Sequence, residues 1–73
     1  MQNLQTLTEQ GRVELFIAEI LKERGAIQNA GACWVTFSDG REKCYRGLDA
    51  EGSGLLQIRS GVKTIFYHQR FCP

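Results

Sequence analysis

Apolar residues recur along the first third of the chain with the period of a helix. Within TLTEQGRVELFIAEILKERG they fall at i, i+3, i+4, i+7 and i+8, which places them on one helical face. These positions are Val13, Phe16, Ile17, Ile20 and Leu21. Lys22 and Arg24 stand where cations favour the negative end of a helix dipole, and Gly25 is suited to close the helix. The pattern predicts a helix over about residues 9–24.

The period changes to two after a short connector. Alternation in CWVTFSDGREKCYRG divides the first run into two faces, namely Cys33, Val35 and Phe37 on one and Trp34, Thr36 and Ser38 on the other. The dipeptide at 39–40, Asp-Gly, is a strong hairpin signal because both residues accept a positive φ. The pattern predicts strands over residues 33–38 and 41–48. Two further strands are expected over 55–59 and 62–71, from LLQIRS and VKTIFYHQRF.

A helix followed by four sequential strands predicts an α+β fold in a single domain, residues 1–73. A four-stranded meander leaves one face to be covered and two edges exposed. Curling the sheet under the helix covers the face, and pairing edges between subunits would make a homo-oligomer. We therefore expect a four- to five-stranded, antiparallel and strongly bent sheet, or a small barrel of the Sm or SH3 type.

Composition places the domain among globular proteins. Apolar residues make up 42% of the chain, too many for a disordered segment, and the formal charges nearly cancel at +1. No run approaches the roughly 20 apolar residues of a membrane-spanning helix. The start, MQNLQTLTEQ, lacks the cations and the apolar stretch of a secretory signal. We expect a soluble, cytoplasmic protein with no membrane partner.

Three cysteines, Cys33, Cys44 and Cys72, form an odd set with no close pair. This spacing is not typical of a secreted disulfide framework. It favours free thiols in a reducing compartment, each packed as a small apolar residue. With His68 the cysteines also match the ligand count of a Cys₃His zinc site, in which Cys33 and Cys44 would face each other across the hairpin. No cofactor is predicted, and zinc is left open as an alternative.

The last predicted strand mixes aromatic and polar side chains on both faces. Aromatic rings stack on bases, and arginine pairs with phosphate or stacks through its planar guanidinium. These residue types predict contacts to RNA or single-stranded nucleic acid at Arg41, Arg46, Tyr67, His68 and Arg70. Trp34 joins them if its face of the hairpin is exposed. The structural alternative is that the aromatics are core residues and the charges protect strand edges.

The whole layout resembles the Sm-like family, in particular the bacterial Hfq proteins. LFIAEILKERG occupies the position of the family's N-terminal helix, and VTFSDGREKCYRG is similar to its strand–turn–strand. LLQIRSG resembles the middle strand, and IFYHQRFCP resembles the closing segment that carries the family histidine. The resemblance implies a ring-forming bent sheet that binds RNA. It makes His68 the contact to a base or phosphate at the mouth of the ring, with Gln10 nearest to a family glutamine.

These observations predict a protein that binds and is not an enzyme. No nucleophile has a recognisable base or oxyanion site. The glycines of EGSGLL precede a predicted strand and not a helix, so we expect no phosphate-binding loop there. The leading prediction is regulatory binding of RNA or single-stranded nucleic acid. The alternative is a protein-interaction module that docks on a larger protein and regulates or inhibits it.

Overall fold

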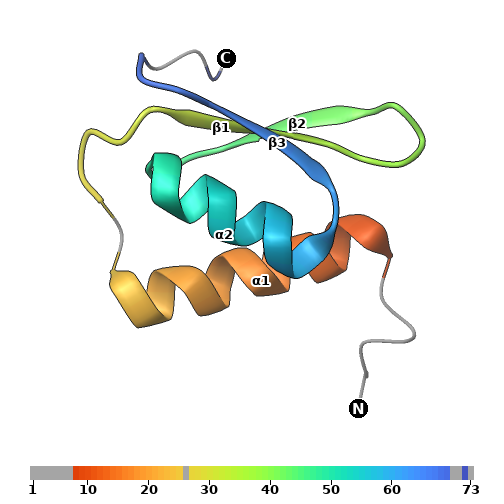
Figure 1. Ribbon diagram of the computed structural model, residues 1–73, viewed down its shortest axis with the longest axis horizontal. Helices are drawn as coiled ribbons and strands as arrows, with labels where there is room; N and C mark the ends of the chain where they lie inside the picture. The colour runs from red at the N-terminus through yellow and green to blue at the C-terminus, as the bar shows by residue number, and fades with distance from the viewer. Residues whose placement is uncertain (1–7, 26, 70–71, 73) are drawn as a thin grey trace.

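The computed structural model describes residues 8–25, 27–69 and 72, with two helices on one side of a three-stranded sheet (Figure 1). Helix α1 spans Glu9–Arg24 and helix α2 spans Ala50–Ser60. The strands are β1 (Ala32–Thr36), β2 (Glu42–Tyr45) and β3 (Lys63–Tyr67), in the sheet order β2-β1-β3. Both outer strands run antiparallel to β1. They are therefore parallel to each other, and α2 joins them as a split β-α-β unit.

The predicted helix over residues 9–24 is confirmed, with both ends closed by local hydrogen bonds. Thr8 is the N-cap, because its Oγ1 accepts a hydrogen bond of 3.0 Å from the Gly11 N–H. At the other end Gly25 has a φ of 80° and its N–H donates to the Leu21 carbonyl oxygen at 2.6 Å. The apolar stripe predicted from the sequence faces inward.

The predicted hairpin is also confirmed, over shorter strands than 33–38 and 41–48. The Phe37 N–H donates to the Arg41 carbonyl oxygen at 2.8 Å, and Gly40 takes a φ of 91° in the turn. Cys33, Val35 and Phe37 share one face, as the alternation of the sequence predicts, and this face is buried. The face of β1 that carries Trp34 and Thr36 therefore points away from the helices.

The prediction of a four- to five-stranded, strongly bent sheet or small barrel is wrong. Within residues 8–25, 27–69 and 72 the sheet is open and has three strands, with β1 at its centre. The segment 55–59, predicted as a strand, lies inside α2. Its short apolar run does not distinguish helix from strand by period. The local signal that favours a helix is Asp49, whose Oδ1 accepts the Gly52 N–H at 2.8 Å and caps α2. The strand predicted over 62–71 is present only over Lys63–Tyr67, as β3. Residues 68 and 69 are not part of the strand, and residues 70 and 71 lie outside the described part.

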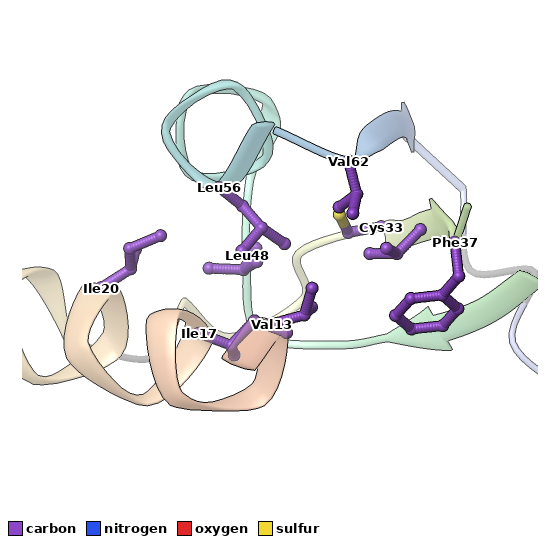
Figure 2. Close-up of a cluster of buried hydrophobic side chains, with 9 residues drawn as sticks. Val13, Ile17, Ile20, Cys33, Phe37, Leu48, Leu56 and Val62 are labelled. Carbon is purple, nitrogen blue, oxygen red and sulfur yellow. The ribbon is translucent and has the colours of Figure 1, made fainter. Parts of the chain in front are cut away.

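The core lies between the two helices and the inner face of the sheet (Figure 2). Ser53 is the buried polar residue beside it, and its Oγ lies 3.0 Å from the Thr64 Oγ1. The largest fully buried side chains are Ile20, Leu48, Leu56, Val13, Val35 and Cys33.

Neither α1, with 16 residues, nor α2, with 11, could cross a bilayer, and no other helix is present in the described residues. Because both helices pack on one side, neither α1 nor α2 covers the outer face of the sheet.

Candidate functional site

The outer face of the sheet carries a row of apolar side chains. Trp34 stands at its centre, because the register pairs it with Cys44 of β2 and with Ile65 of β3. Tyr67 follows Ile65 by two residues and so lies on the same face. Ile65 and Tyr67 are each 41% exposed, and Trp34 is half-buried. Exposed apolar side chains that cluster on one surface are typical of an interaction site.

A groove of about 340 Å³ opens in this row, and we call it the sheet groove. Its lining consists of Trp34, Thr36, Glu42, Ile65 and Tyr67. Thr36 pairs with Glu42 across β1 and β2, so the carboxylate stands at the edge strand beside the apolar row. Among the described residues, Glu42 forms no ion pair with a cation. The groove therefore combines aromatic and aliphatic walls with one negative charge that has no ion-pair partner in the described part of the chain.

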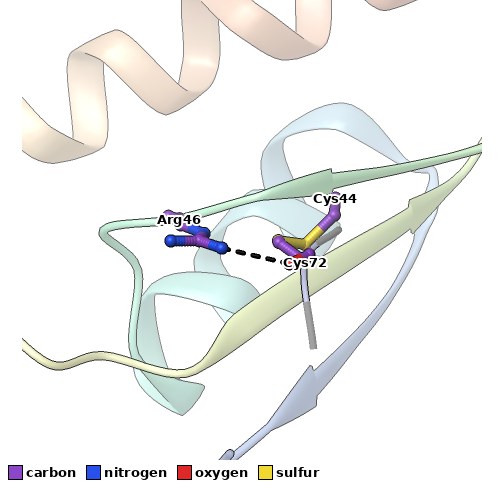
Figure 3. The surroundings of a disulfide bond; sticks show 3 residues. All are labelled: Cys44, Arg46 and Cys72. Atoms are coloured by element: carbon purple, nitrogen blue, oxygen red, sulfur yellow. Dashed lines mark hydrogen bonds between the residues drawn. A yellow bond between two sulfur atoms is a disulfide. The ribbon is translucent and has the colours of Figure 1, made fainter. Parts of the chain in front are cut away.

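A disulfide between Cys44 and Cys72 borders this groove (Figure 3). The two Cα atoms are 5.7 Å apart, and Arg46 Nη2 donates to the Cys72 carbonyl oxygen at 3.1 Å. A second hollow of about 310 Å³ adjoins the first and includes both cysteines and Trp34. Since β3 and β2 are opposite edges of the sheet, the bond ties a residue that follows β3 to the far edge.

The expectation of three free thiols is wrong for Cys44 and Cys72 and confirmed for Cys33. Cys33 is free and buried, and burial raises the pKa of its thiol. The argument from free thiols for a reducing compartment no longer holds. Cys33 pairs with Tyr45 and faces the helices, so it does not face Cys44 across the hairpin. In the part of the chain described, no three His, Cys, Asp or Glu side chains gather to hold a metal ion.

The residues predicted to contact nucleic acid do not form one site. Arg41 lies at the hairpin turn, where its Nε donates to Asp39 Oδ2 at 2.7 Å and its guanidinium lies over the Phe37 ring. Tyr67 lies at the other end of the sheet, paired with Ala32. Arg70 lies outside the described residues. Arg41 and Tyr67 therefore lie at opposite ends of the sheet, separated by the length of β1.

Arg46 and His68 lie nearer to Tyr67 than Arg41 does, but they face different surroundings. Arg46 follows β2 and is held by the Cys72 carbonyl oxygen. His68 follows β3, is exposed, and meets the Phe66 ring edge-on at 6.1 Å between centroids. It borders a separate hollow that also contains the acidic residues Asp49 and Glu51. The lining of this hollow includes these two carboxylates and no lysine or arginine.

Ion pairs engage many of the remaining charges on the helical side. Arg24 donates to both carboxylate oxygens of Asp49, at 2.9 and 3.0 Å. Together with the Gly52 N–H, these bonds lower the pKa of Asp49 to about 2. Lys43 lies 3.5 Å from Glu14, whose pKa is lowered by hydrogen bonds from Gln10 and from the Tyr45 hydroxyl. These contacts place carboxylates beside Arg24 and Lys43, which weakens the attraction of both cations for a polyanion.

The glycines of EGSGLL lie in the first turns of α2, so the sequence-based reason against a phosphate loop there is wrong. The N-terminus of α2 is nevertheless occupied, because the Asp49 carboxylate already accepts the Gly52 N–H. A phosphate would have to displace this carboxylate, which Arg24 also holds.

Comparisons of the chain with protein-family models, curated proteins and solved structures found no match. The resemblance to Sm-like proteins thus stays a prediction, while the bent sheet that it implied is not the fold. Sequence reasoning did not select Glu42 or Ile65 for the site. Only the register of β3 against β1 places Ile65 and Tyr67 beside Trp34.

Proposed function

We propose that this protein is a non-enzymatic binding module that docks a segment of a larger protein on the outer face of its sheet. The observation that carries the proposal is the row formed by Trp34, Ile65 and Tyr67, left uncovered by both helices. Aromatic residues and exposed aliphatic side chains supply most of the energy at protein interfaces. The row lies next to the sheet groove, which gives a docked side chain a place to enter.

Charge in the groove favours a protein over a nucleic acid. A single-strand-binding sheet needs cations for phosphates and flat rings for bases. Here the carboxylate in the lining is Glu42, which repels phosphate, and the lining includes no lysine or arginine. Arg41 is neutralised by Asp39. The same charge pattern defines the partner as an apolar segment that carries a basic side chain toward Glu42.

Peptide display on the purified protein tests this proposal. We expect a random library to yield apolar peptides with a basic residue, and their binding to fall at least about tenfold in Ile65→Lys, because a charge then stands in the apolar row. Ile58→Lys is the matched control, since Ile58 is 81% exposed on α2 and the change adds the same charge. Its peptide affinities should equal those of the unchanged protein.

Two results would overturn the proposal. The first is a set of peptides whose binding is equally sensitive to the changes at Ile65 and Ile58. The second is tight binding of a uridine 20-mer RNA, measured by fluorescence anisotropy, with an affinity that falls steeply and log-linearly with salt. The latter result would favour the nucleic-acid prediction, and a shallow salt dependence of peptide binding is expected instead.

A further inference from the structure

We infer that the sheet groove binds the guanidinium group of an arginine side chain on the docked segment. This inference rests on the proposed function and specifies its chemistry. The groove has aromatic walls from two neighbouring strands, a carboxylate at its edge strand and an aliphatic side chain between them. Each of these three features matches a different part of an arginine side chain.

The indole of Trp34 matches the flat cationic head. Glu42 lies diagonally across β1 and β2 from Trp34, whereas Tyr67 lies diagonally from Trp34 on β3 toward the opposite end of the sheet, so Trp34 is the ring that a group bound to Glu42 can reach. A guanidinium is attracted to the face of an indole or phenol ring, and it loses less hydration than an ammonium group when it stacks. Ile65, paired directly with Trp34, can pack against the methylene stem.

The polar side of the groove matches the N–H donors. Glu42 and Thr36 are cross-strand partners on the same face, so the carboxylate and the hydroxyl stand side by side. A carboxylate accepts two parallel hydrogen bonds from a guanidinium, a geometry that lysine cannot reproduce. Among the described ion pairs, other carboxylates at Glu14, Glu23 and Asp39 already have cations, whereas Glu42 does not.

Lys63 is the nearest opposing charge on this face. It pairs with Thr36 from the side of β3, so two strand spacings, about 10 Å, separate its backbone from that of Glu42. No ion pair joins the two within the described residues. Lys63 should therefore weaken the binding of a cation without neutralising Glu42. Removing the charge of Lys63 should strengthen the binding of arginine, whereas removing the charge of Glu42 should weaken it.

Nuclear magnetic resonance can follow the groove directly, because Trp34 is the single tryptophan of the chain. The probe is the peptide acetyl-Ala-Arg-Ala-amide, titrated against the labelled protein while the indole N–H signal of Trp34 is recorded. We expect a saturable shift at millimolar peptide. The same peptide with citrulline, which is neutral and nearly isosteric, should bind about tenfold more weakly because the charge-assisted bonds are lost. The lysine peptide should fall between the two.

Variants separate the carboxylate from general charge. Glu42→Gln should weaken the arginine peptide about tenfold and leave the citrulline peptide unchanged. Glu19→Gln, an exposed carboxylate on α1, changes the net charge equally and should have no effect. Lys63→Gln should strengthen binding of the arginine peptide. Glu42 is exposed, so these variants keep their folded spectra.

The inference is overturned if the arginine and citrulline peptides bind equally, or if Glu42→Gln and Glu19→Gln behave alike. It is also overturned if Ile65-dependent display peptides contain no arginine, a result that leaves the docking proposal intact. If no display peptide depends on Ile65 but the arginine probe binds, docking itself is wrong and the groove is a site for a small guanidinium compound.

Discussion

Loss of the Cys44–Cys72 disulfide is expected to remove a large part of the stability of this protein. The bond joins residues 28 positions apart. In the chain-entropy account, closing a loop of this size in the unfolded chain stabilises the native state by about 3.5 kcal/mol. A chain of 73 residues has a total unfolding free energy of roughly 4 to 11 kcal/mol, at about 0.05–0.15 kcal/mol per residue. The reduced protein should therefore be marginal.

Urea unfolding with and without dithiothreitol measures this effect. With an m-value of about 1 kcal/mol/M, the midpoint should fall by about 3.5 M when the reductant is present. The double variant Cys44→Ser/Cys72→Ser should unfold at the lower midpoint in both conditions. Thiol titration in denaturant provides a separate count, because the oxidised protein should react at Cys33 alone and the reduced protein at three positions.

Two outcomes would refute this reasoning. If the urea midpoint of the unchanged protein is insensitive to reductant, the bond does not constrain the unfolded chain. If the oxidised protein titrates three thiols, the bond is absent. A reduced stability in Cys33→Ala would not bear on the question, because that change removes a buried core side chain.

Three further predictions concern the fold that supports the groove. Leu56→Ala should lower the unfolding free energy by about 2–5 kcal/mol, because Leu56 is fully buried, whereas Ile58→Ala on the same helix should change it by less than about 0.5 kcal/mol. Asp49→Ala should cost about 0.5–2 kcal/mol through the lost helix cap. Because the folded pKa of Asp49 is about 2 against an ordinary 3.8, its contribution is present above pH 3.8 and is lost as the pH falls toward 2. Gly31→Ala should destabilise the protein by about 1–3 kcal/mol, since an added Cβ would overlap a carbonyl oxygen at the end of β3, whereas Gly54→Ala should stabilise it by about 0.5–1 kcal/mol.

Chemical denaturation checks all of these predictions, with the measurement at Asp49 repeated between pH 2 and pH 6. Equal losses at Leu56 and Ile58 would contradict the assignment of the core. A pH profile that is the same with and without Asp49 would show that its carboxylate does not stabilise the fold. If Gly31→Ala is tolerated as well as Gly54→Ala, the close approach of the two backbones at the end of the sheet is wrong.

The first half of the fold could be predicted from the sequence, because its signals are local. The stripe from Val13 to Leu21 and the Asp-Gly turn specify a helix and a hairpin without reference to the rest of the chain. The segment after Leu48 could not be assigned in the same way. Leu55, Leu56 and Ile58 fit either period, and Gly52 and Gly54 disfavour a helix by propensity. Only the two ends of this helix carry local signals for it. Asp49 is its N-cap, and Gly61, which has a φ of 76°, closes it.

The candidate site depended on contacts that are distant in the sequence. Alternation correctly placed Trp34 on the face opposite Cys33, Val35 and Phe37, but it could not show which face is exposed or that β3 pairs with β1. The spacing of the cysteines along the chain also could not show that Cys72 reaches Cys44. These two residues come together because of the order of the strands in the sheet. The arginine and histidine candidates were chosen by chemical type, and the register places them at separate ends of the sheet.

The central position of β1 also has a consequence for synthesis. The ribosome makes β1 early, but one of its two neighbours, β3, is the last of the five elements to emerge. A nascent chain that has reached only Gly61 has both helices and the hairpin, yet β1 still exposes a free edge and the core lacks Val62. Folding of this chain should therefore complete only after β3 has left the exit tunnel, and until then the edge of β1 stays open to pairing with a strand of another chain.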